Sequence, residues 1–424
     1  MQFQDFATRR HCVWLDTAAG QGPSLLAADP KRIIRAKGRH IQIITPAGTQ
    51  HFDADPFAAL QAELAQSPGT AIGYFGYDLK NFVERLPSQS LDDLGLPDLW
   101  FGFYEAPVMS TNSGTGVPSV VLNPPDRRDA CSTNFTRDSY RQAVQRAKNY
   151  IAAGDIYQVN LSQRFQCQVD ASAMEVYRAL RAANPAPYCA YLDIGDAQIL
   201  SSSPECFLKL DDRQVITRPI KGTRPRGAVE RASRPFTGTR KTGKTPVPLT
   251  DDQLVRELLA APKDNAELLM IIDLERNDLG RVCDFGSVHV PELVRVESFA
   301  TVHHLVATVA GTLRPDVSHV DCVRACFPGG SITGAPKIRA MEIIDELEPH
   351  ARGIYTGAIG FFDPAGRRSH FNIAIRTAVY QPGGRLTFQA GGGIVADSDP
   401  DAEYDETLAK AQGIFNALNQ LRLR

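Results

Sequence analysis

Strand-like runs recur along the whole 424-residue chain, and helical patterns interrupt them without the regular alternation of a βαβ fold. The expected strands cover residues 41–44, 71–77, 157–165, 190–194, 199–210, a run around 288, 301–312, 358–362 and 373–380. The expected helices cover residues 56–66, 136–153, 174–183, 317–326, 337–347 and 401–421. This order predicts an α+β fold with large, mostly antiparallel β-sheets.

One of these helices has a signal at each end. Thr136 stands where a hydroxyl side chain caps a helix N-terminus, and Gly154 follows the last expected helical residue, Ala153. Between them, Tyr140 and Val144 recur at the spacing of one helix face.

A stretch rich in Ser, Thr, Asn, Gly and Pro, residues 109–135, indicates a linker. We therefore expect an N-terminal region at residues 1–130 and a larger domain at residues 135–424. Within the larger domain, residues 228–254 hold five basic residues and three prolines with little apolar material. This composition predicts a mobile insertion on the surface.

The composition excludes several classes of protein. The net charge is -2 and the pI about 6.5, so no surface for nucleic acid is expected. No apolar run approaches the roughly 20 residues of a membrane span, and the N-terminus lacks a signal-peptide core. Eight cysteines are scattered without a Cys-x-x-Cys pair. This pattern favours reduced thiols and a cytoplasmic location over a zinc site or a disulfide scaffold.

Residues 238–245 fit the Walker A pattern of a phosphate-binding loop. Such a loop needs a strand before it and a helix after it. Here Pro235 precedes the stretch, and Pro246 and Pro248 would disrupt the first helical turn. We interpret the match as coincidental and keep a P-loop ATP-binding protein as a remote alternative.

A short stretch, residues 218–227, combines four basic residues with two prolines and two glycines. Glycine allows a backbone to approach a ligand closely, and proline restricts the chain. Lys221, beside Gly222 and Thr223, would bind an anion or would attack carbon once its ammonium loses a proton. The alternative is a solvated basic turn.

Two acidic pairs have helical spacing, Asp264 with Glu267 and Glu403 with Glu406. Residues three apart lie on one face of a helix. If the pairs meet, their oxygens would suit Mg²⁺, a hard cation that also keeps water and substrate oxygens as ligands. Otherwise each pair is a solvated helix face.

Two glycine-rich turns offer bare backbone to a ligand. Residues 327–337 open a helix whose N–H groups would receive an anion, and residues 390–394 lead towards Glu403. Arg376 is a charge in an apolar strand and needs a partner if it is buried. His304 also lies in an apolar run, where a lone histidine is more often a hydrogen-bonded core residue than a catalyst.

Taken together, these stretches resemble the chorismate-utilising enzymes, a family that includes anthranilate, aminodeoxychorismate, isochorismate and salicylate synthases. The matching stretches are residues 154–162, 203–205, 219–227, 266–278, 327–341 and 405–407. The N-terminal third resembles the less distinctive N-terminal region of the same family. The resemblance implies a two-layer core of large antiparallel sheets with helices on the outside. It also implies an anthranilate synthase component I-like region at residues 1–130 and a chorismate-binding catalytic domain at residues 135–424.

Two positions indicate which member of the family the chain resembles. Isochorismate- and salicylate-forming members carry a water-activating lysine where this chain has Gln158, so ammonia is the expected nucleophile. Lys221 stands where anthranilate synthases typically have alanine, and a lysine there is the mark of aminodeoxychorismate synthase component I. The resemblance therefore implies conversion of chorismate and ammonia to 4-amino-4-deoxychorismate, for 4-aminobenzoate and folate biosynthesis, through a covalent Lys221 adduct.

The resemblance also implies roles for individual residues. Lys221 would be the nucleophile and Glu205 the general acid, and His304 would lie beside the leaving group. The substrate-binding residues would be Gly222, Thr223, Ser331, Tyr355, Arg376, Gly391, Gly392, Gly393 and Lys410. The ligands of Mg²⁺ would be Glu267, Glu403, Glu406 and Asp264.

The chain has no Gly-x-Cys-x-Gly turn of a glutaminase nucleophile. The resemblance therefore implies that a separate glutamine amidotransferase subunit delivers the ammonia, in a heterodimer. Anthranilate synthase component I, of tryptophan biosynthesis, is the near alternative, and a non-catalytic interaction module is a remote one.

Overall fold

The computed structural model describes residues 6, 8–18, 24–105, 107–110, 131–225, 250–299, 302–364 and 366–421. In these residues the strands form two large sheets, and every named pair of neighbouring strands is antiparallel. The first sheet contains, in spatial order, β18 (Gly334–Ala335), β10 (Gln158–Gln168), β22 (Arg385–Ile394), β21 (Thr377–Gln381), β12 (Gln198–Ser203), β11 (Tyr188–Asp193), β1 (Val13–Asp16), β2 (Ser24–Ala27) and β8 (Val108–Ser110), with β9 (Cys131–Thr133) beside β10.

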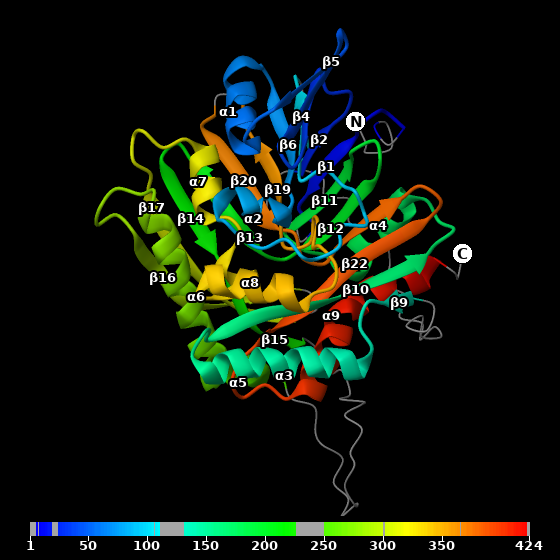
Figure 1. Ribbon diagram of the computed structural model, residues 1–424. Coiled ribbons are helices and arrows are strands. Elements are labelled where there is room, and N and C mark those ends of the chain that lie inside the picture. The colour runs from blue at the N-terminus through cyan, green and yellow to red at the C-terminus, as the bar shows by residue number, and fades with distance from the viewer. Residues whose placement is uncertain are drawn as a thin grey trace, which may run out of the picture.

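The second sheet begins with the strand that carries Lys221. It contains, in spatial order, β15 (Ile220–Pro225), β17 (Val302–Thr312), β14 (Gln214–Arg218), β13 (Cys206–Asp211), β20 (Arg368–Ile373), β19 (Ala358–Phe362), β6 (Thr70–Phe75), β7 (Leu99–Tyr104), β3 (Arg32–Lys37), β4 (His40–Thr45) and β5 (Gly48–Asp53), with β16 (His289–Ser298) beside β17. Sequence-distant strands are therefore neighbours in both sheets (Figure 1).

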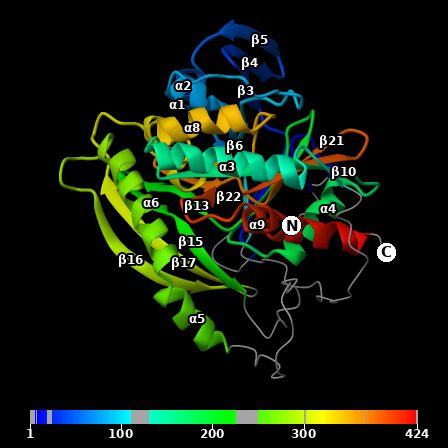
Figure 2. The ribbon, with the colours of Figure 1, turned by 60° about the horizontal axis from the view of Figure 1, so that its bottom comes forward.

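Helices cover the outer faces of the sheets (Figures 1 and 2). The helices are α1 (Pro56–Gln66), α2 (Lys80–Val83), α3 (Arg137–Ala153), α4 (Ala173–Ala183), α5 (Asp251–Ala260), α6 (Pro262–Gly280), α7 (His319–Cys326), α8 (Lys337–Leu347) and α9 (Pro400–Leu421), with short 3₁₀ turns η2 (Tyr77–Leu79) and η4 (Gly330–Ile332). Side chains of α1, α6 and α7 pack on the second sheet, and those of α4 and α9 pack on the first. Helices α3 and α8 share a cluster with β10.

The two sheets also pack on each other, as the alternation of side chains in β6 and β7 makes clear. Successive side chains of a strand point to opposite faces of the sheet. Ile72, Tyr74 and Trp100 join the cluster that contains residues of the first sheet. Their neighbours Phe75 and Phe101 join the cluster beneath α1 and α7. The predicted α+β fold, with a two-layer core of antiparallel sheets and helices outside, is confirmed.

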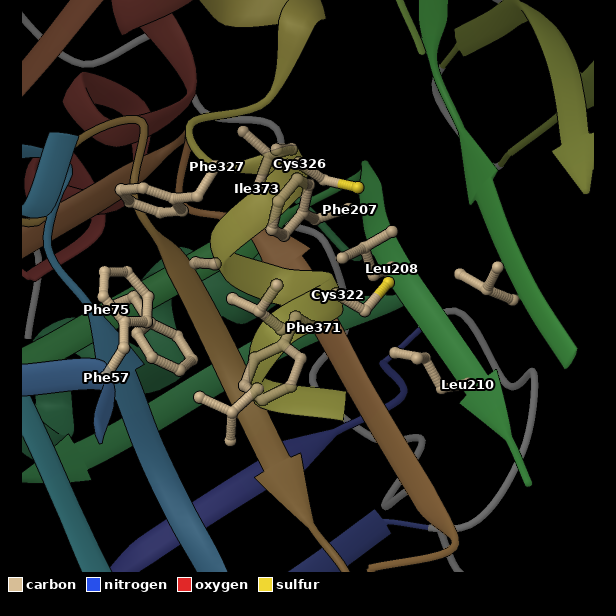
Figure 3. Packing of buried hydrophobic residues seen from close by; sticks show 14 of the residues in the cluster. Phe57, Phe75, Phe207, Leu208, Leu210, Cys322, Cys326, Phe327, Phe371 and Ile373 are labelled. Atoms are coloured by element: carbon tan, nitrogen blue, oxygen red, sulfur yellow. The ribbon is translucent and has the colours of Figure 1, made fainter. Parts of the chain in front are cut away.

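Figure 3 shows the cluster beneath α1 and α7 from close by. Phe327 follows α7 and leads into the turn that carries Ser331. Its ring lies 6.5 Å from that of Phe57, 6.3 Å from Phe75 and 6.2 Å from Phe207, between centroids. These are ordinary distances for favourable aromatic pairs. The core therefore anchors the turn that presents Ser331.

The end signals of α3 are confirmed. The Thr136 side chain accepts from the Ser139 N–H, and the Ser139 side chain accepts from the Thr136 N–H. This reciprocal pair satisfies donors that a helix N-terminus leaves free. Gly154 ends the helix with a φ of 84°, a conformation that glycine adopts without a steric penalty.

Two of the predicted strands were wrong in the same way, because each is two strands in different sheets. Residues 199–210 form β12 of the first sheet and β13 of the second, and the chain crosses between the sheets at Pro204 and Glu205. Residues 373–380 include the end of β20 and all of β21, and the chain crosses back between them. The crossings are bonded to each other, since the Ile373 N–H donates to the Glu205 carbonyl at 3.0 Å and the Ser203 hydroxyl donates to the Ile373 carbonyl at 2.6 Å.

The N-terminal region supplies strands to both sheets, with β1 and β2 in the first and β3 to β7 in the second. The domain boundary between residues 130 and 135 stays a prediction. Of the predicted insertion at 228–254, residues up to 249 lie outside the described residues, as does the Walker-like stretch at 238–245. The remaining residues open α5, which Thr250 caps through the Gln253 N–H.

The prediction that the cysteines are reduced was wrong for one pair, since Cys131 and Cys167 form a disulfide. They lie opposite each other in the pairing of β9 with β10, which brings residues 36 positions apart into contact. The other six cysteines are free and buried. In the part of the chain that the structure describes, no helix is long and apolar enough to cross a membrane.

Candidate active site

Lys221 lies on β15, where the pairing with β17 is interrupted by a bulge between Lys221 and Thr223. The intervening Gly222 has a φ of 68°, and a Cβ there would lie 2.9 Å from Leu258 and 3.0 Å from Asp264. Gly222 is therefore needed for two reasons, its backbone conformation and the close approach of α5 and α6. The described part of the basic stretch, residues 218–225, therefore ends β14 and forms the bulged strand β15, and is not a solvated turn.

The ammonium of Lys221 points at a group of charged side chains. Its Nζ donates to the Ser331 carbonyl at 3.3 Å. Burial lowers the pKa of Lys221, against the nearby charges of Glu267 and Glu205, while Lys410 lowers it further. A lysine with a lowered pKa is more often neutral, which is the form that attacks carbon.

Glu205 lies at the crossing between the two sheets and is buried. Its N–H donates to the Ser203 hydroxyl at 3.3 Å, which fixes the backbone at this position. Burial raises the pKa of Glu205, and the Ser331 hydroxyl and the Lys221 charge oppose the rise. A carboxyl with a raised pKa keeps its proton nearer to neutral pH and can therefore donate it.

His304 lies on β17 opposite Thr223, and its Nδ1 is 2.9 Å from the Thr223 hydroxyl oxygen. Burial lowers its pKa to about 3, with a further contribution from the charge of Arg376. The imidazole is therefore neutral at physiological pH. Its Nε2 has no hydrogen-bond partner among the described residues. One ring nitrogen therefore bonds Thr223, and the other is free to contact a ligand.

Arg376 does not lie within a strand as expected but at the second crossing, with a φ of 49°. Burial lowers its pKa, against the influence of Cys189 and Glu205. Its guanidinium forms no ion pair with the described residues, so this half-buried charge is available to an anionic ligand. Tyr355 is buried, and the guanidinium carbon of Arg352 lies 5.6 Å from the centroid of its ring.

The glycine run of β22 makes room for its neighbours. Gly391 lies against β10, where a Cβ would be 2.5 Å from the Leu161 carbonyl oxygen. At Gly393 a Cβ would be 2.3 Å from the Gln158 side-chain nitrogen. Larger residues would therefore displace β10 or Gln158, so these glycines have a packing role besides any contact with a ligand.

Gly392 provides the space in which two of the predicted metal ligands meet. A Cβ at this position would lie 3.2 Å from both Glu403 Oε2 and Glu406 Oε1. Glu403 accepts at Oε1 from the Ser398 hydroxyl at 2.6 Å, while its buried Oε2 has no partner among the described residues. Glu406 forms an ion pair with Lys410 at 2.8 Å.

The other two predicted ligands lie on α6, which runs beside β15 and β17 (Figure 2). Glu267 Oε2 accepts from the Gln158 side-chain nitrogen at 3.4 Å, and Glu267 Oε1 lies 4.0 Å from Lys263 Nζ. Asp264 instead forms an ion pair with Arg224 at 3.1 Å. The two carboxylates of this pair therefore have different partners.

These contacts test whether the acidic residues fit a divalent cation. Glu403 has a buried carboxylate oxygen without a hydrogen-bond partner among the described residues, and the missing side chain at Gly392 leaves room for two carboxylates. All the donors are oxygens, as Mg²⁺ prefers. Among the described residues, no group of three acidic, histidine or cysteine side chains is already arranged around a metal position. The donor set fits the ion, with Lys263 and Lys410 beside the carboxylates.

Sequence reasoning did not select Glu275, a buried carboxyl group on α6. The Thr217 hydroxyl donates to its Oε2 at 2.7 Å, and burial raises its pKa to about 8. It lines a small cavity with Phe207 and with Gly329 and Gly330, the residues before Ser331. The available signal was an acidic residue on the apolar face of an amphipathic helix.

Comparisons with known proteins identify the family of the chain. The profile of the family described as chorismate binding enzyme matches residues 10–416. The aminodeoxychorismate synthase component 1 of Bacillus subtilis is 36% identical, over 98% of this chain and 94% of the relative. The anthranilate synthase component 1 of Pseudomonas putida is 38% identical, over 93% of this chain and 86% of the relative.

Solved structures give the same result. The crystal structure of anthranilate synthase component I from Streptococcus pneumoniae is 31% identical, with a TM-score of 0.77 over 93% of this chain and 92% of that one. Nearly the whole chain is therefore similar in sequence and in fold to enzymes of this kind. The chain belongs to the family of chorismate binding enzymes, and it is an enzyme that acts on chorismate.

Proposed function

We propose that the chain is aminodeoxychorismate synthase component I, which converts chorismate and ammonia to 4-amino-4-deoxychorismate. The observation that carries the proposal is the position of Lys221. Its ammonium lies between Ser331 and the charges of Glu205 and Glu267, and burial lowers its pKa. Burial favours the neutral amine, which is the form in which a lysine acts as a nucleophile.

In the first step, the neutral amine of Lys221 attacks the ring carbon next to the one that bears the carboxylate. A C–N bond forms, both conjugated double bonds of the ring shift by one position, and the bond from C4 to its hydroxyl breaks. Glu205 supplies the proton with which the hydroxyl leaves as water, a role that its raised pKa supports. His304, neutral and with a free Nε2, would lie beside this leaving group.

In the second step, ammonia attacks C4 and both double bonds shift back, which breaks the bond to the Lys221 nitrogen. The nitrogen that joined C4 gives up a proton, and the carboxylate of Glu205 is placed to accept it, which restores the acid. The departing Lys221 amine is neutral again for the next cycle. The sequence of bonds balances without an oxidant or reductant.

Substrate carboxylates would be held by the side chains that lack a protein partner or carry spare donors. Arg376 is the first of these, since its half-buried guanidinium forms no ion pair with the described residues. Tyr355, Lys410 and the backbone at Gly393 would complete the set. Gly222, Thr223 and Ser331 would line the ring.

Glu267, Glu403 and Glu406 would hold Mg²⁺, which when bound would neutralise the ring carboxylate of the substrate. We leave Asp264 outside the first set of ligands because its ion pair with Arg224 already uses its charge. The proposal also includes a cytoplasmic heterodimer with a glutamine amidotransferase that delivers the ammonia for 4-aminobenzoate and folate biosynthesis.

Relatives named anthranilate synthase are as similar to the chain as those named aminodeoxychorismate synthase, so this activity is the competing candidate. The test incubates the purified chain with chorismate, Mg²⁺ and ammonium at mildly alkaline pH. With an added 4-amino-4-deoxychorismate lyase, 4-aminobenzoate should appear. Anthranilate that accumulates without the lyase would instead identify an anthranilate synthase, in which Lys221 does not direct the chemistry.

A further inference from the structure

One lysine beside the acidic group has no role in the proposed reaction. Lys263 precedes Glu267 by one helical turn, and its Nζ lies 4.0 Å from Glu267 Oε1. Its side chain is 58% exposed, whereas that of Glu267 is 18% exposed. The ammonium therefore reaches from solvent to a largely buried carboxylate.

The position of Lys263 is unfavourable for the helix that carries it. It is the second residue of α6, where the helix macrodipole is positive and disfavours a cation. A lysine placed four residues before a glutamate is also the weaker order for a helical ion pair. Local helix energetics therefore do not explain a lysine at this position, and a partner outside α6 would.

The acidic group supplies such partners. The charge of Lys263 lowers the pKa values of both Glu403 and Glu406, which lie on α9. Burial raises the pKa of Glu403, and the charge of Glu406 raises it further. The geometry agrees, since Glu403 and Glu406 lie against Gly392 and the next residue, Gly393, lies against the Gln158 nitrogen that bonds Glu267. The carboxylates of α6 and α9 therefore flank the same glycine run, with Lys263 beside Glu267.

Lys410 also lies beside the group, but it is held more firmly. Its Nζ donates to the Gly391 carbonyl at 2.9 Å and pairs with Glu406 at 2.8 Å. The described residues give Lys263 no comparable backbone bond. Of the two cations, Lys263 is therefore the one that can leave without breaking a hydrogen bond of the fold.

We propose that the ammonium of Lys263 is an exchangeable counter-ion of the carboxylates of Glu267, Glu403 and Glu406, and that a divalent cation displaces it on binding. A long, exposed side chain lets the ammonium move into water while its stem stays on the helix. Without the cation, Lys263 limits the repulsion among the carboxylates. When the cation is present, Lys263 competes with it for the carboxylates. The inference rests on the proposed metal site.

The test measures Mg²⁺ binding to the metal-free full chain by isothermal titration calorimetry, without substrate. Lys263→Met should tighten Mg²⁺ binding about two- to fivefold, because the competing charge is gone. Lys263→Arg keeps the charge and should bind like the wild type. Lys31→Met, which removes an exposed lysine before β3, controls for the change in net charge.

A second readout is the thermal midpoint without and with Mg²⁺. Lys263→Met should lower the midpoint of the metal-free chain, and saturating Mg²⁺ should restore it, because ligand binding stabilises the native state. Mg²⁺ binding that is unchanged or weaker in Lys263→Met overturns the exchange and leaves the metal site intact. Binding to neither the wild type nor the variant overturns the metal site as well.

Discussion

The strands β6 and β7 and the strands β15 and β22 belong to the same two-sheet core but are built differently. In β6 and β7 every side chain is buried, and both faces are filled by apolar and aromatic residues. Around β15 and β22 the buried or half-buried groups are Lys221, Glu205, Glu403 and Arg376. The first region stabilises the fold by apolar burial. The second places charged groups where burial shifts their pKa values, which costs stability and gives reactivity.

The largest effect on activity is expected at Glu205. Replacement of Glu205 by Gln removes the proton donor and retains the size of the side chain. Loss of general acid catalysis costs about 10²- to 10⁴-fold in rate. Stability should stay the same or rise, because a buried ionisable group is replaced by a neutral one. Steady-state kinetics and urea unfolding together check both parts. A stable, fully active variant would remove Glu205 from the mechanism.

A change at Phe75, in the apolar region, is expected to reduce stability and to leave activity nearly unchanged. Phe75→Ala removes a fully buried ring that contacts Phe57, Phe101 and Phe371. Truncation of a buried Phe costs about 3–5 kcal/mol of unfolding free energy. The activity per folded molecule should change little. Chemical denaturation measures the loss, and a cost below about 1 kcal/mol would contradict the account of this core.

Glu275 is expected to make the stability of the fold depend on pH. Burial, together with the charges of Glu205 and Asp278, raises its pKa from 4.5 to about 8, while the Thr217 hydrogen bond and the charge of Lys337 oppose the rise. Between these two pH values the folded state keeps a proton that the unfolded state loses. Stability should therefore fall as pH rises, by up to about 1.4 kcal/mol per pH unit from this group.

The matching variant is Glu275→Gln, which cannot ionise and still offers an oxygen to the Thr217 hydroxyl. Urea midpoints measured from pH 5 to pH 8 should fall less steeply in the variant than in the wild type, because the titrating group is gone. Parallel curves for the two proteins would show that Glu275 ionises alike in the folded and unfolded states.

The smallest effect is expected for an ion pair on the surface. Arg213 and Asp284 form a pair in which both side chains are more than two-fifths exposed. Solvent-exposed pairs contribute about 0–1 kcal/mol. Asp284→Asn should therefore change the unfolding free energy by less than about 1 kcal/mol and leave activity intact. A larger loss, persisting in high salt, would mean that the pair does more than its exposure suggests.

Much of the fold could be predicted from local signals, and the exceptions share a cause. The ends of α3 could be predicted because Thr136 and Gly154 act within one helical turn. The crossing at Arg376 could not, because apolar residues on both sides of it hide the change of sheet. At Glu205 the preceding serines and Pro204 interrupt the apolar run, but no local signal says that the chain passes to another sheet. The Cys131–Cys167 disulfide depends on strand register, which the sequence does not display.

Some features of the candidate site could likewise be predicted from the sequence, and others could not. The meeting of Glu403 with Glu406 follows from their helical spacing. The pairing of Asp264 with Arg224 joins α6 to β15, and no local pattern predicts it. Gly392 was expected to face a ligand, and the structure adds that its missing side chain makes room for two carboxylates. Such contacts appear only when distant segments are brought together.

The covalent adduct on Lys221 is the central claim, and mass spectrometry tests it most directly. The chain is incubated with chorismate and Mg²⁺ in the absence of ammonia, quenched and digested. The account predicts that the peptide containing Lys221 gains the mass of chorismate less one water, that ammonium removes this adduct, and that Lys221→Ala never acquires it. Steady formation of product from chorismate and ammonium, with no adduct on that peptide under any quench, would contradict the account.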